Sequence, residues 1–252
     1  MSGKFVNRFT GKAEAYSKYR PTYPREILDI LNKEIGFSED KVIADIGSGT
    51  GILSKIFLDN GNRVFGIEPN SEMRSFAEKN LSRYDNFISL NQTAENTSLS
   101  AGSIDLVTAG QALHWFDPDK SRKEFVRILR SLGHVMIVYN ERKEGDGTMK
   151  DYENVSNKYA TKYEASDINK EYLTKFFNNK NYKELNVPNK QMLDFEALVG
   201  RASSASYLPS KDDPDFELLK QDLKKMFDEH QENGLVTLNY KTLIFLGQIL
   251  IG

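Results

Sequence analysis

A short segment of β-branched and small apolar residues, Lys41–Ile46, leads directly into three glycines at alternate positions, Gly47, Gly49 and Gly51. Helical spacing follows at once, because Ile52–Asn60 repeats its apolar side chains every three to four residues. A buried strand, a glycine turn and a helix in immediate succession are typical of the first βα unit of a parallel sheet. Glycines let the backbone approach a ligand closely at this turn, so we expect a binding site there.

The same alternation of strand and helix continues to about residue 140. The strand-like segments are Asn62–Ile67, Asn86–Leu90, Ser103–Ala109 and His134–Tyr139, and the helix-like segments are Ser71–Leu81 and Pro118–Leu132. Strands that alternate with helices predict an α/β fold, in which a parallel sheet carries helices on both faces.

The second part of the chain has a different character. Residues 150–190 are rich in Asn, Lys and Tyr, with helical spacing near Lys150–Tyr163 and Asn169–Asn178. Such a segment suits a cap over a pocket, although an irregular loop is the alternative, and its tyrosines either line a pocket or pack on the core. Beyond it we predict a strand, two helices and two C-terminal strands: Tyr182–Val187, Phe195–Arg201, Asp215–His230, Val236–Tyr240 and Leu243–Leu250.

We therefore predict one domain over residues 1–252. Residues 1–140 form its N-terminal segment and ligand-binding core, residues 141–233 its cap and substrate region, and residues 234–252 the last strands of the sheet.

Composition excludes several classes of function. The 34 Lys and Arg residues are balanced by 36 Asp and Glu residues, so the chain lacks the basic excess of a nucleic-acid-binding protein. It has no cysteine, which removes thiolate metal sites and cysteine nucleophiles, and its three histidines are scattered, so no metal site is predicted. No membrane-spanning run of about 18 apolar residues and no secretory signal are visible, and we expect a cytoplasmic protein without membrane association.

The spacing of the glycines discriminates between nucleotide ligands. The dinucleotide fingerprint needs a glycine where Ile52 stands, and the lysine of a P-loop is missing. Glu68 follows Gly47 by about 20 residues and closes the second predicted strand, where a carboxylate accepts hydrogen bonds from both hydroxyls of a ribose. Together these features predict a nucleoside ligand that carries something other than a pyrophosphate.

Five motifs in order add a family resemblance. They are Y-x-x-Y-R-P-x-Y-P at 16–24, D-I-G-S-G-T-G at 45–51, G-I-E-P-N at 66–70, T-A-E-N-T-S-L at 93–99 and S-I-D-L-V-T-A-G-Q-A-L-H-W-F-D at 103–117. The chain thereby resembles the class I S-adenosylmethionine-dependent methyltransferases, and more narrowly the small-molecule subgroup called methyltransferase type 11. The resemblance implies a Rossmann-like, seven-stranded, mostly parallel sheet whose last strand is antiparallel, with helices on both faces and an inserted helical cap. It implies S-adenosylmethionine as the cofactor and an oxygen or nitrogen of a small molecule as the methyl acceptor.

The resemblance also assigns the cofactor site residue by residue. The glycine loop would hold the amino-acid part of the cofactor, Asp45 would bind its ammonium group and Glu68 would bind its ribose. The adenine would lie near Pro69, Met73, Ala94 and Glu95, and the methionine moiety near Gln111. Residues of the N-terminal segment would close over the cofactor. The implied set is Tyr16 or Tyr19, Arg20, Asp45, Gly47, Ser48, Gly49, Gly51, Glu68, Pro69, Met73, Ala94, Glu95 and Gln111.

Candidates for the acceptor side follow the fourth strand and the helix near residue 200. His114 is either a general base or a residue that orders its loop, and the neighbouring Trp115 is a candidate substrate contact. Arg201 could clamp a carboxylate, with Ser206 and Tyr207 donating hydrogen bonds, although the serines could equally cap a helix.

The segment after the fourth strand lacks the N-P-P-aromatic motif of nucleic-acid amino-methyltransferases, so the resemblance does not extend to them. A binder without catalysis and a methyltransferase acting on RNA or protein remain alternatives. We expect a monomer or a homodimer.

Overall fold

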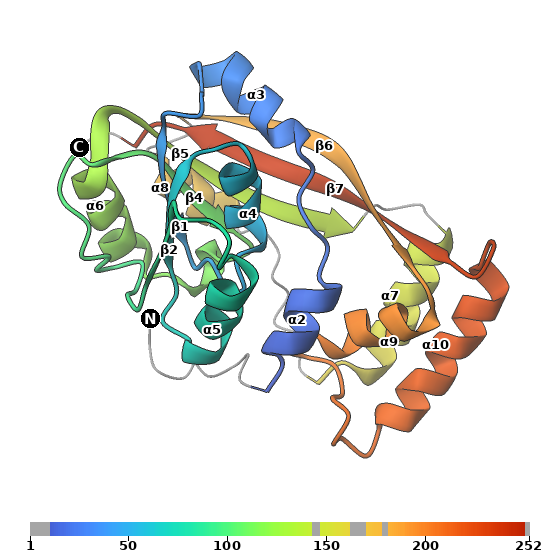
Figure 1. Cartoon of the computed structure of the whole chain (residues 1–252). Coiled ribbons are helices and arrows are strands. Elements are labelled where there is room, and N and C mark those ends of the chain that lie inside the picture. The colour runs from blue at the N-terminus through green and yellow to red at the C-terminus, as the bar shows by residue number, and fades with distance from the viewer. Residues whose placement is uncertain (1–10, 143–146, 162–169, 178–180, 250–252) are drawn as a thin grey trace.

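The computed structural model describes residues 11–142, 147–161, 170–177 and 181–249. Within them, seven strands form one sheet in the order β3-β2-β1-β4-β5-β7-β6 (Figure 1). The strands are β1 (Val42–Ile46), β2 (Arg63–Ile67), β3 (Phe87–Leu90), β4 (Ile104–Gly110), β5 (Leu129–Arg142), β6 (Tyr182–Leu193) and β7 (Val236–Gly247). Since β7 is antiparallel to both β5 and β6 while the other pairs are parallel, the predicted mostly parallel sheet with an antiparallel last strand is confirmed.

Helices cover both faces of this sheet. They are α2 (Ala13–Tyr19), α3 (Glu26–Ile35), α4 (Ile52–Asp59), α5 (Ser71–Asn80), α6 (Pro118–Ile128), α7 (Gly147–Tyr159), α8 (Lys170–Phe176), α9 (Phe195–Ser203) and α10 (Phe216–His230). The helices α3 and α4 bury Leu31 and Phe57 against one face, whereas α6 and α8 bury Phe125 and Phe176 against the other. The two apolar faces of the sheet thus form two separate cores, as a parallel sheet requires.

A third core lies at one end of β6 and β7. Here α7, α9 and α10 pack together, and we call this group the cap. Tyr152, Leu198 and Leu223 meet Leu238 of β7 in its interior. In Figure 1 the cap lies at the far end of β6 and β7, away from α6. The helix predicted at 169–178 was expected in the cap region, but the corresponding α8 packs on the main core through aromatic contacts with α6. Tyr163, Asn169, Asn178 and Leu250, at the ends of predicted segments, lie outside the described residues.

Three predicted boundaries were wrong, each for a physical reason. The two C-terminal strands are one continuous strand, since Lys241 is an exposed position in an alternating pattern and pairs with Glu141. The strand at Tyr182 continues to Leu193 through Pro188, which is tolerated because β6 is an edge strand. Helix α6 ends at Ile128, because Leu129 is already extended and pairs with Ile104.

The N-terminal segment carries two helices that the motif-based prediction did not include. The backbone carbonyl of Thr22 accepts hydrogen bonds from Asn140 of β5 and Asn189 of β6, at 3.1 and 2.7 Å. The segment between α2 and α3 is thereby fixed to the sheet, and α2 lies between α5 and α9 (Figure 1). In the part of the chain that the structure describes, no helix has the length and apolar character needed to cross a membrane.

Candidate functional site

The glycine loop joins β1 to α4 at the carboxyl edge of the sheet. Gly47 has a φ of 69°, and a Cβ atom there would lie 2.7 Å from the Cβ of Ala112. Gly49 has a φ of 56°, and its backbone N–H donates a 3.0 Å hydrogen bond to Oε2 of Glu68. Only glycine adopts this backbone without strain and leaves the space beside the loop open. The loop and the end of β2 therefore form one unit.

Glu68 is the acidic centre of that unit. Its Oε1 accepts the N–H of Asn70 at 2.8 Å, and the side chain is only 9% exposed. Burial raises the pKa of Glu68, while the hydrogen bonds from Asn70 and Gly49 oppose the rise. Each carboxylate oxygen has two lone pairs, so both still accept a further hydrogen bond. A ribose diol supplies two hydroxyl donors, and the predicted partner of Glu68 fits this arrangement.

Asp45 lies beneath the loop and is fully buried. Its carboxylate accepts hydrogen bonds from Ser54 of α4 at 2.6 Å and Thr108 of β4 at 3.1 Å. Burial raises the pKa of Asp45 to about 6, against the effect of these two hydroxyls. The residue holds β1, β4 and α4 together at the site, and its contact with a cofactor ammonium group stays a prediction.

The predicted adenine side is built from α5 and the loop after β3. Met73 is buried, with its N–H bonded to the side chain of Asn70, the N-cap of α5. Ala94 is 1% exposed, and Glu95 accepts the N–H of Asp117 at 2.9 Å. The carbonyl of Pro69 lies 3.5 Å from a guanidinium nitrogen of Arg74. Contact of these residues with a cofactor adenine stays a prediction.

Backbone strain marks the end of β4. Gln111 has a φ of 55°, which is unfavourable for a residue with a side chain, and it is held there by a 2.9 Å hydrogen bond from its N–H to Val138. The next residues form a 3₁₀ turn in which the exposed ring of His114 lies 4.3 Å from that of Trp115 and 6.3 Å from that of Tyr139. These contacts agree with an ordering role for His114, and its role as a base stays untested.

The N-terminal candidates divide between two locations. The guanidinium of Arg20 lies over the ring of Tyr16, 4.9 Å from its centroid. Tyr19 instead packs against Gly200 of α9. Tyr23, which the sequence reasoning did not select, places its hydroxyl 2.7 Å from the position of a Cβ on Gly110. Burial, and to a smaller extent the electrostatic effect of Tyr16 and Asp45, raises the pKa of Tyr23 well above its usual value of 10. Its place at the end of the Y-x-x-Y-R-P-x-Y-P motif was the signal that could have found it.

The candidates near residue 200 separate in a similar way. Arg201 is 4% exposed, and Tyr207 shares a 2.7 Å hydrogen bond with Nη2 of Arg142. Ser203 and Ser204 donate to carbonyls of their own helix, so the helix-capping interpretation is correct for them. Ser206 is half-buried in the turn that follows α9. The structure thus brings Arg201 and Tyr207 together with two residues that were not predicted, Arg142 and Tyr152.

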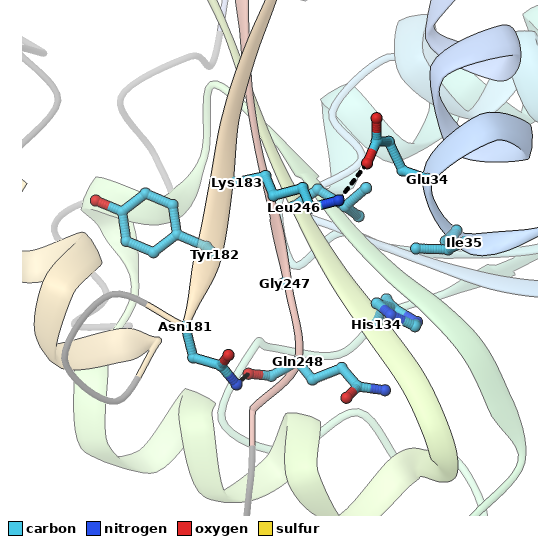
Figure 2. A pocket seen from close by; sticks show the side chains of 9 residues that line it. All are labelled: Glu34, Ile35, His134, Asn181, Tyr182, Lys183, Leu246, Gly247 and Gln248. Atoms are coloured by element: carbon cyan, nitrogen blue, oxygen red, sulfur yellow. Dashed lines mark hydrogen bonds and ion pairs between the residues drawn. The ribbon is translucent and has the colours of Figure 1, made fainter.

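A pocket of about 290 Å³ lies at the opposite edge of the sheet (Figure 2). His134 at the start of the parallel run of β5, Gly247 at the end of β7 and Tyr182 at the start of β6 line it. Lys183 forms an ion pair with Glu34 at its rim. Ligands of parallel sheets bind at the carboxyl ends of the strands, so this pocket is distinct from the glycine-loop site.

Within the residues that the structure describes, one group of possible metal ligands lies in the cap. Ligand atoms of Asp151, Glu229 and His230 lie within 4.8 Å of one another. Nε2 of His230 is 2.7 Å from Asp151, and Thr148 lies 3.4 Å from Nδ1. These contacts join α7 to α10 and account for the histidine as a structural residue.

The doubly wound sheet, the left-handed glycine loop and the buried carboxylate at the end of β2 define a nucleoside-binding protein of the Rossmann-like class. Comparison with known proteins narrows this class. The family model described as methyltransferase domain, of type 11, matches residues 44–137. An uncharacterized methyltransferase of Oceanobacillus iheyensis is 31% identical over 200 residues, which are 75% of this chain and 88% of that protein. The chain belongs to the class I S-adenosylmethionine-dependent methyltransferases, as its motifs indicate.

Other relatives match a smaller part of the chain in sequence, or match its fold. An uncharacterized methyltransferase of Mycobacterium tuberculosis is 32% identical over 143 residues, so that this chain spans only 56% of the relative's length. A solved structure of a candidate type II methyltransferase from Anaeromyxobacter dehalogenans has a TM-score of 0.66 at 20% identity and covers 93% of this chain and 100% of its own. A phosphoethanolamine N-methyltransferase of Haemonchus contortus has a TM-score of 0.55 at 16% identity, over 96% of this chain and 58% of its own. The solved structures show the shared fold.

Proposed function

We propose that this protein transfers a methyl group from S-adenosylmethionine to an oxygen or nitrogen of a small-molecule acceptor. The observation that carries the proposal is the pair formed by Gly49 and Glu68, a loop amide and a buried carboxylate joined at 3.0 Å at the carboxyl edge of the sheet. This pair occurs within a family of methyltransferases and in the strand context that a nucleoside needs.

The residues present fit the cofactor part by part. Both oxygens of Glu68 keep lone pairs for the two ribose hydroxyls, and Gly47 and Gly49 leave open backbone for the amino-acid part. Met73 offers its methyl group 3.4 Å from the position of a Cβ on Gly49, a short apolar wall beside the loop. Asp45 supplies a buried negative charge below the loop, opposite in sign to an ammonium group.

When bound, S-adenosylmethionine supplies a methyl group on a positively charged sulfur that a nucleophile displaces directly. The protein therefore has to orient the acceptor and exclude water more than to supply reactive groups. Gln111 and the 3₁₀ turn hold the β4 end of the site in a strained, fixed conformation. If the acceptor must lose a proton, the imidazole of His114 is the candidate that receives it.

The acceptor side is assigned to the cap and to the N-terminal segment. Tyr23 lies against Gly110 at the end of β4, and Arg20 donates a hydrogen bond to the carbonyl of Ser204 at the end of α9. Trp115, Arg201 of α9, and Ser206 and Tyr207 in the turn that follows α9 stay the proposed acceptor contacts. The net charge of −2 favours a small molecule over a nucleic acid as the acceptor.

Titration calorimetry with S-adenosylhomocysteine tests the cofactor assignment, and we expect saturable binding to one site. A panel of small hydroxyl, amine and acid acceptors with S-adenosylmethionine, followed by detection of S-adenosylhomocysteine release, tests the transfer. The absence of cofactor binding at about 1 mM ligand, corresponding to less than about 4 kcal/mol of binding free energy, would refute the proposal.

A further inference from the structure

The side chain of Arg201 lies almost wholly inside the cap. It is 4% exposed on α9, and among the described residues its Nε and Nη1 atoms find no hydrogen-bond acceptor. A guanidinium is always charged in a protein. The guanidinium of Arg201 forms a hydrogen bond with Tyr240, but among the described residues no carboxylate forms an ion pair with it. A buried charge without a counter-charge disfavours the folded state. Buried donors in folded proteins nearly always have an acceptor, so this pair of nitrogens requires an explanation.

Two more arginines approach Arg201 from different elements. Arg20, at the end of α2, donates from Nη2 to the carbonyl of Ser204, and its own buried Nε has no partner within the part of the chain described. Arg142, at the end of β5, interacts electrostatically with Arg201 and lies 5.4 Å from the ring centroid of Tyr152. Burial and the positive charge of Arg201 lower the pKa of Arg20, as expected where like charges are close.

The surroundings supply donors and very little negative charge. The hydroxyl of Tyr152 is buried and also lacks a partner among the residues described. Of the carboxylates within the described ranges, Glu153 alone forms an ion pair with one of these arginines, at 3.5 Å to Arg142, and its side chain is 40% exposed. The acceptor-poor interior therefore holds more positive charge than the protein itself balances.

This cluster adjoins the cofactor site. The hydroxyl of Tyr23 lies 2.7 Å from the position of a Cβ on Gly110, at the end of β4, and Tyr23 also interacts electrostatically with Arg20 and Asp45. Arg20 in turn connects to the end of α9, three residues beyond Arg201. A molecule bound to the arginines can therefore extend toward the end of β4, where the methyl group would be transferred.

We propose that the methyl acceptor is a small organic anion whose acid group is bound by Arg142 and Arg201, with Tyr152 and Tyr207 as further donors. The inference rests on the proposed function and adds the chemical class of the substrate. An acid group brings the acceptor oxygens that the unpartnered donors lack, and arginine forks match both carboxylates and phosphates. Arg20, at the boundary, separates this group from the cofactor.

The test measures anion binding to the full chain saturated with S-adenosylhomocysteine, and separately without it, by thermal shift and calorimetry at low salt. The probes are succinate, glycerol 3-phosphate and the neutral ester dimethyl succinate. We expect succinate or glycerol 3-phosphate to raise the unfolding temperature saturably, by about 4–7 °C at a 20-fold excess over its Kd, and the ester to have no effect. Binding of succinate would indicate a carboxylate acceptor, and binding of glycerol 3-phosphate a phosphate acceptor. If neither acid binds, the proposal is overturned.

Arg201→Met removes the charge and keeps the length of the side chain. We expect anion affinity to fall at least tenfold, as it also should in Arg142→Met, while affinity for S-adenosylhomocysteine changes less than threefold. The control is Arg83→Met, at a side chain that is 68% exposed and pairs with Asp59, and it should bind anions normally. A parallel loss of S-adenosylhomocysteine affinity in Arg201→Met would mean that Arg201 binds the cofactor, and would overturn the proposal.

The stability of the ligand-free variant gives an independent readout. An arginine kept for a ligand destabilises the free protein, so Arg201→Met should unfold at the same temperature as the wild type or at a higher one. A fall of more than about 5 °C would identify Arg201 as a structural residue and refute the inference. Absence of S-adenosylhomocysteine binding with intact anion binding would reject the proposed function and leave the anion site standing.

Discussion

Replacement of Glu68 by alanine probes the cofactor site most directly. The carboxylate has two oxygens, each already bonded to one backbone amide and each with a lone pair for a ribose hydroxyl. Hydrogen bonds to a charged group contribute about 1.5–3 kcal/mol each, so loss of two gives roughly 3–6 kcal/mol as an upper range. Water that enters the space would form hydrogen bonds with the ribose hydroxyls and offset part of this loss. We therefore expect a loss of binding free energy of about 3 kcal/mol, or roughly a 150-fold increase in Kd.

Calorimetric titration with S-adenosylhomocysteine measures this change. Glu68→Ala also leaves the amides of Gly49 and Asn70 without their acceptor, so the fold of the variant has to be checked by circular dichroism. Glu68→Gln keeps the volume, but its amide group must turn a donor toward one of those two N–H groups, and we expect at least a tenfold loss. Glu78→Ala is the matched control, since Glu78 is a 52% exposed carboxylate on α5.

The pH dependence gives a second signature of the same residue. Burial raises the pKa of Glu68, whereas two hydroxyl donors favour its charged form. The cofactor should therefore bind with release of a proton at low pH, and its Kd should rise as the pH falls through the raised pKa. This dependence should vanish in Glu68→Gln. An affinity within threefold of wild type in Glu68→Ala would remove Glu68 from the ribose site and refute the assignment.

Three further outcomes follow from individual side chains. Gly51→Ala should destabilise the protein by about 2–4 kcal/mol in urea unfolding, because Gly51 has a φ of 84° and a Cβ there would lie 2.6 Å from Leu81. The control is Gly102→Ala, which has a φ of 60° and open space around it and should destabilise the protein by about 1–2 kcal/mol. Equal losses of stability in the two variants would contradict the packing argument. Burial raises the pKa of Asp45 from 3.8 to about 6, so the folded state favours the protonated carboxyl group. This contribution to stability is complete below the unfolded pKa of about 4 and is lost as the pH rises through about 6. Relative to Asp45→Asn, the free energy of unfolding of the wild type should fall by about 3 kcal/mol between pH 4 and 7. If the two proteins show the same pH dependence of the free energy of unfolding in urea, this expectation is wrong. His114→Ala should leave the Kd for S-adenosylhomocysteine within about threefold, because the exposed ring contacts side chains of its own turn and of β5, and a large rise in Kd would place it against the cofactor.

The cofactor half of the molecule was predictable because its signals are local in sequence. The loop from Gly47 to Gly51 is a contiguous motif, and its left-handed glycines follow from the need to turn from a strand into a helix. Glu68 is fixed by the length of one βα unit, so its distance from the loop could be counted along the chain. The hydrogen bond from Gly49 to Glu68 shows that the two features lie side by side in the structure.

The elements that were predicted wrongly depend on long-range pairing. A charged residue in an apolar run, such as Lys241, is read as a break until its partners on both sides are known. The helix α8 carries the polar composition of a surface segment, but Phe176 and the following Phe177 are buried and contact Phe125 of α6 and Tyr182 of β6. Neither outcome is encoded within a window of ten residues, because the energy that decides it comes from contacts with residues far along the chain.

The arginine cluster shows the same limit at the level of function. Arg20, Arg142 and Arg201 are far apart in sequence, and each alone is an ordinary surface-type residue. Only the antiparallel β7 and the fixed position of Thr22 bring the end of α2, the end of β5 and α9 together. A cap that served stability alone would bury apolar side chains at these places, as it does at Leu198. The unsatisfied guanidinium nitrogens therefore mark the part of the cap whose sequence is explained by a ligand rather than by folding.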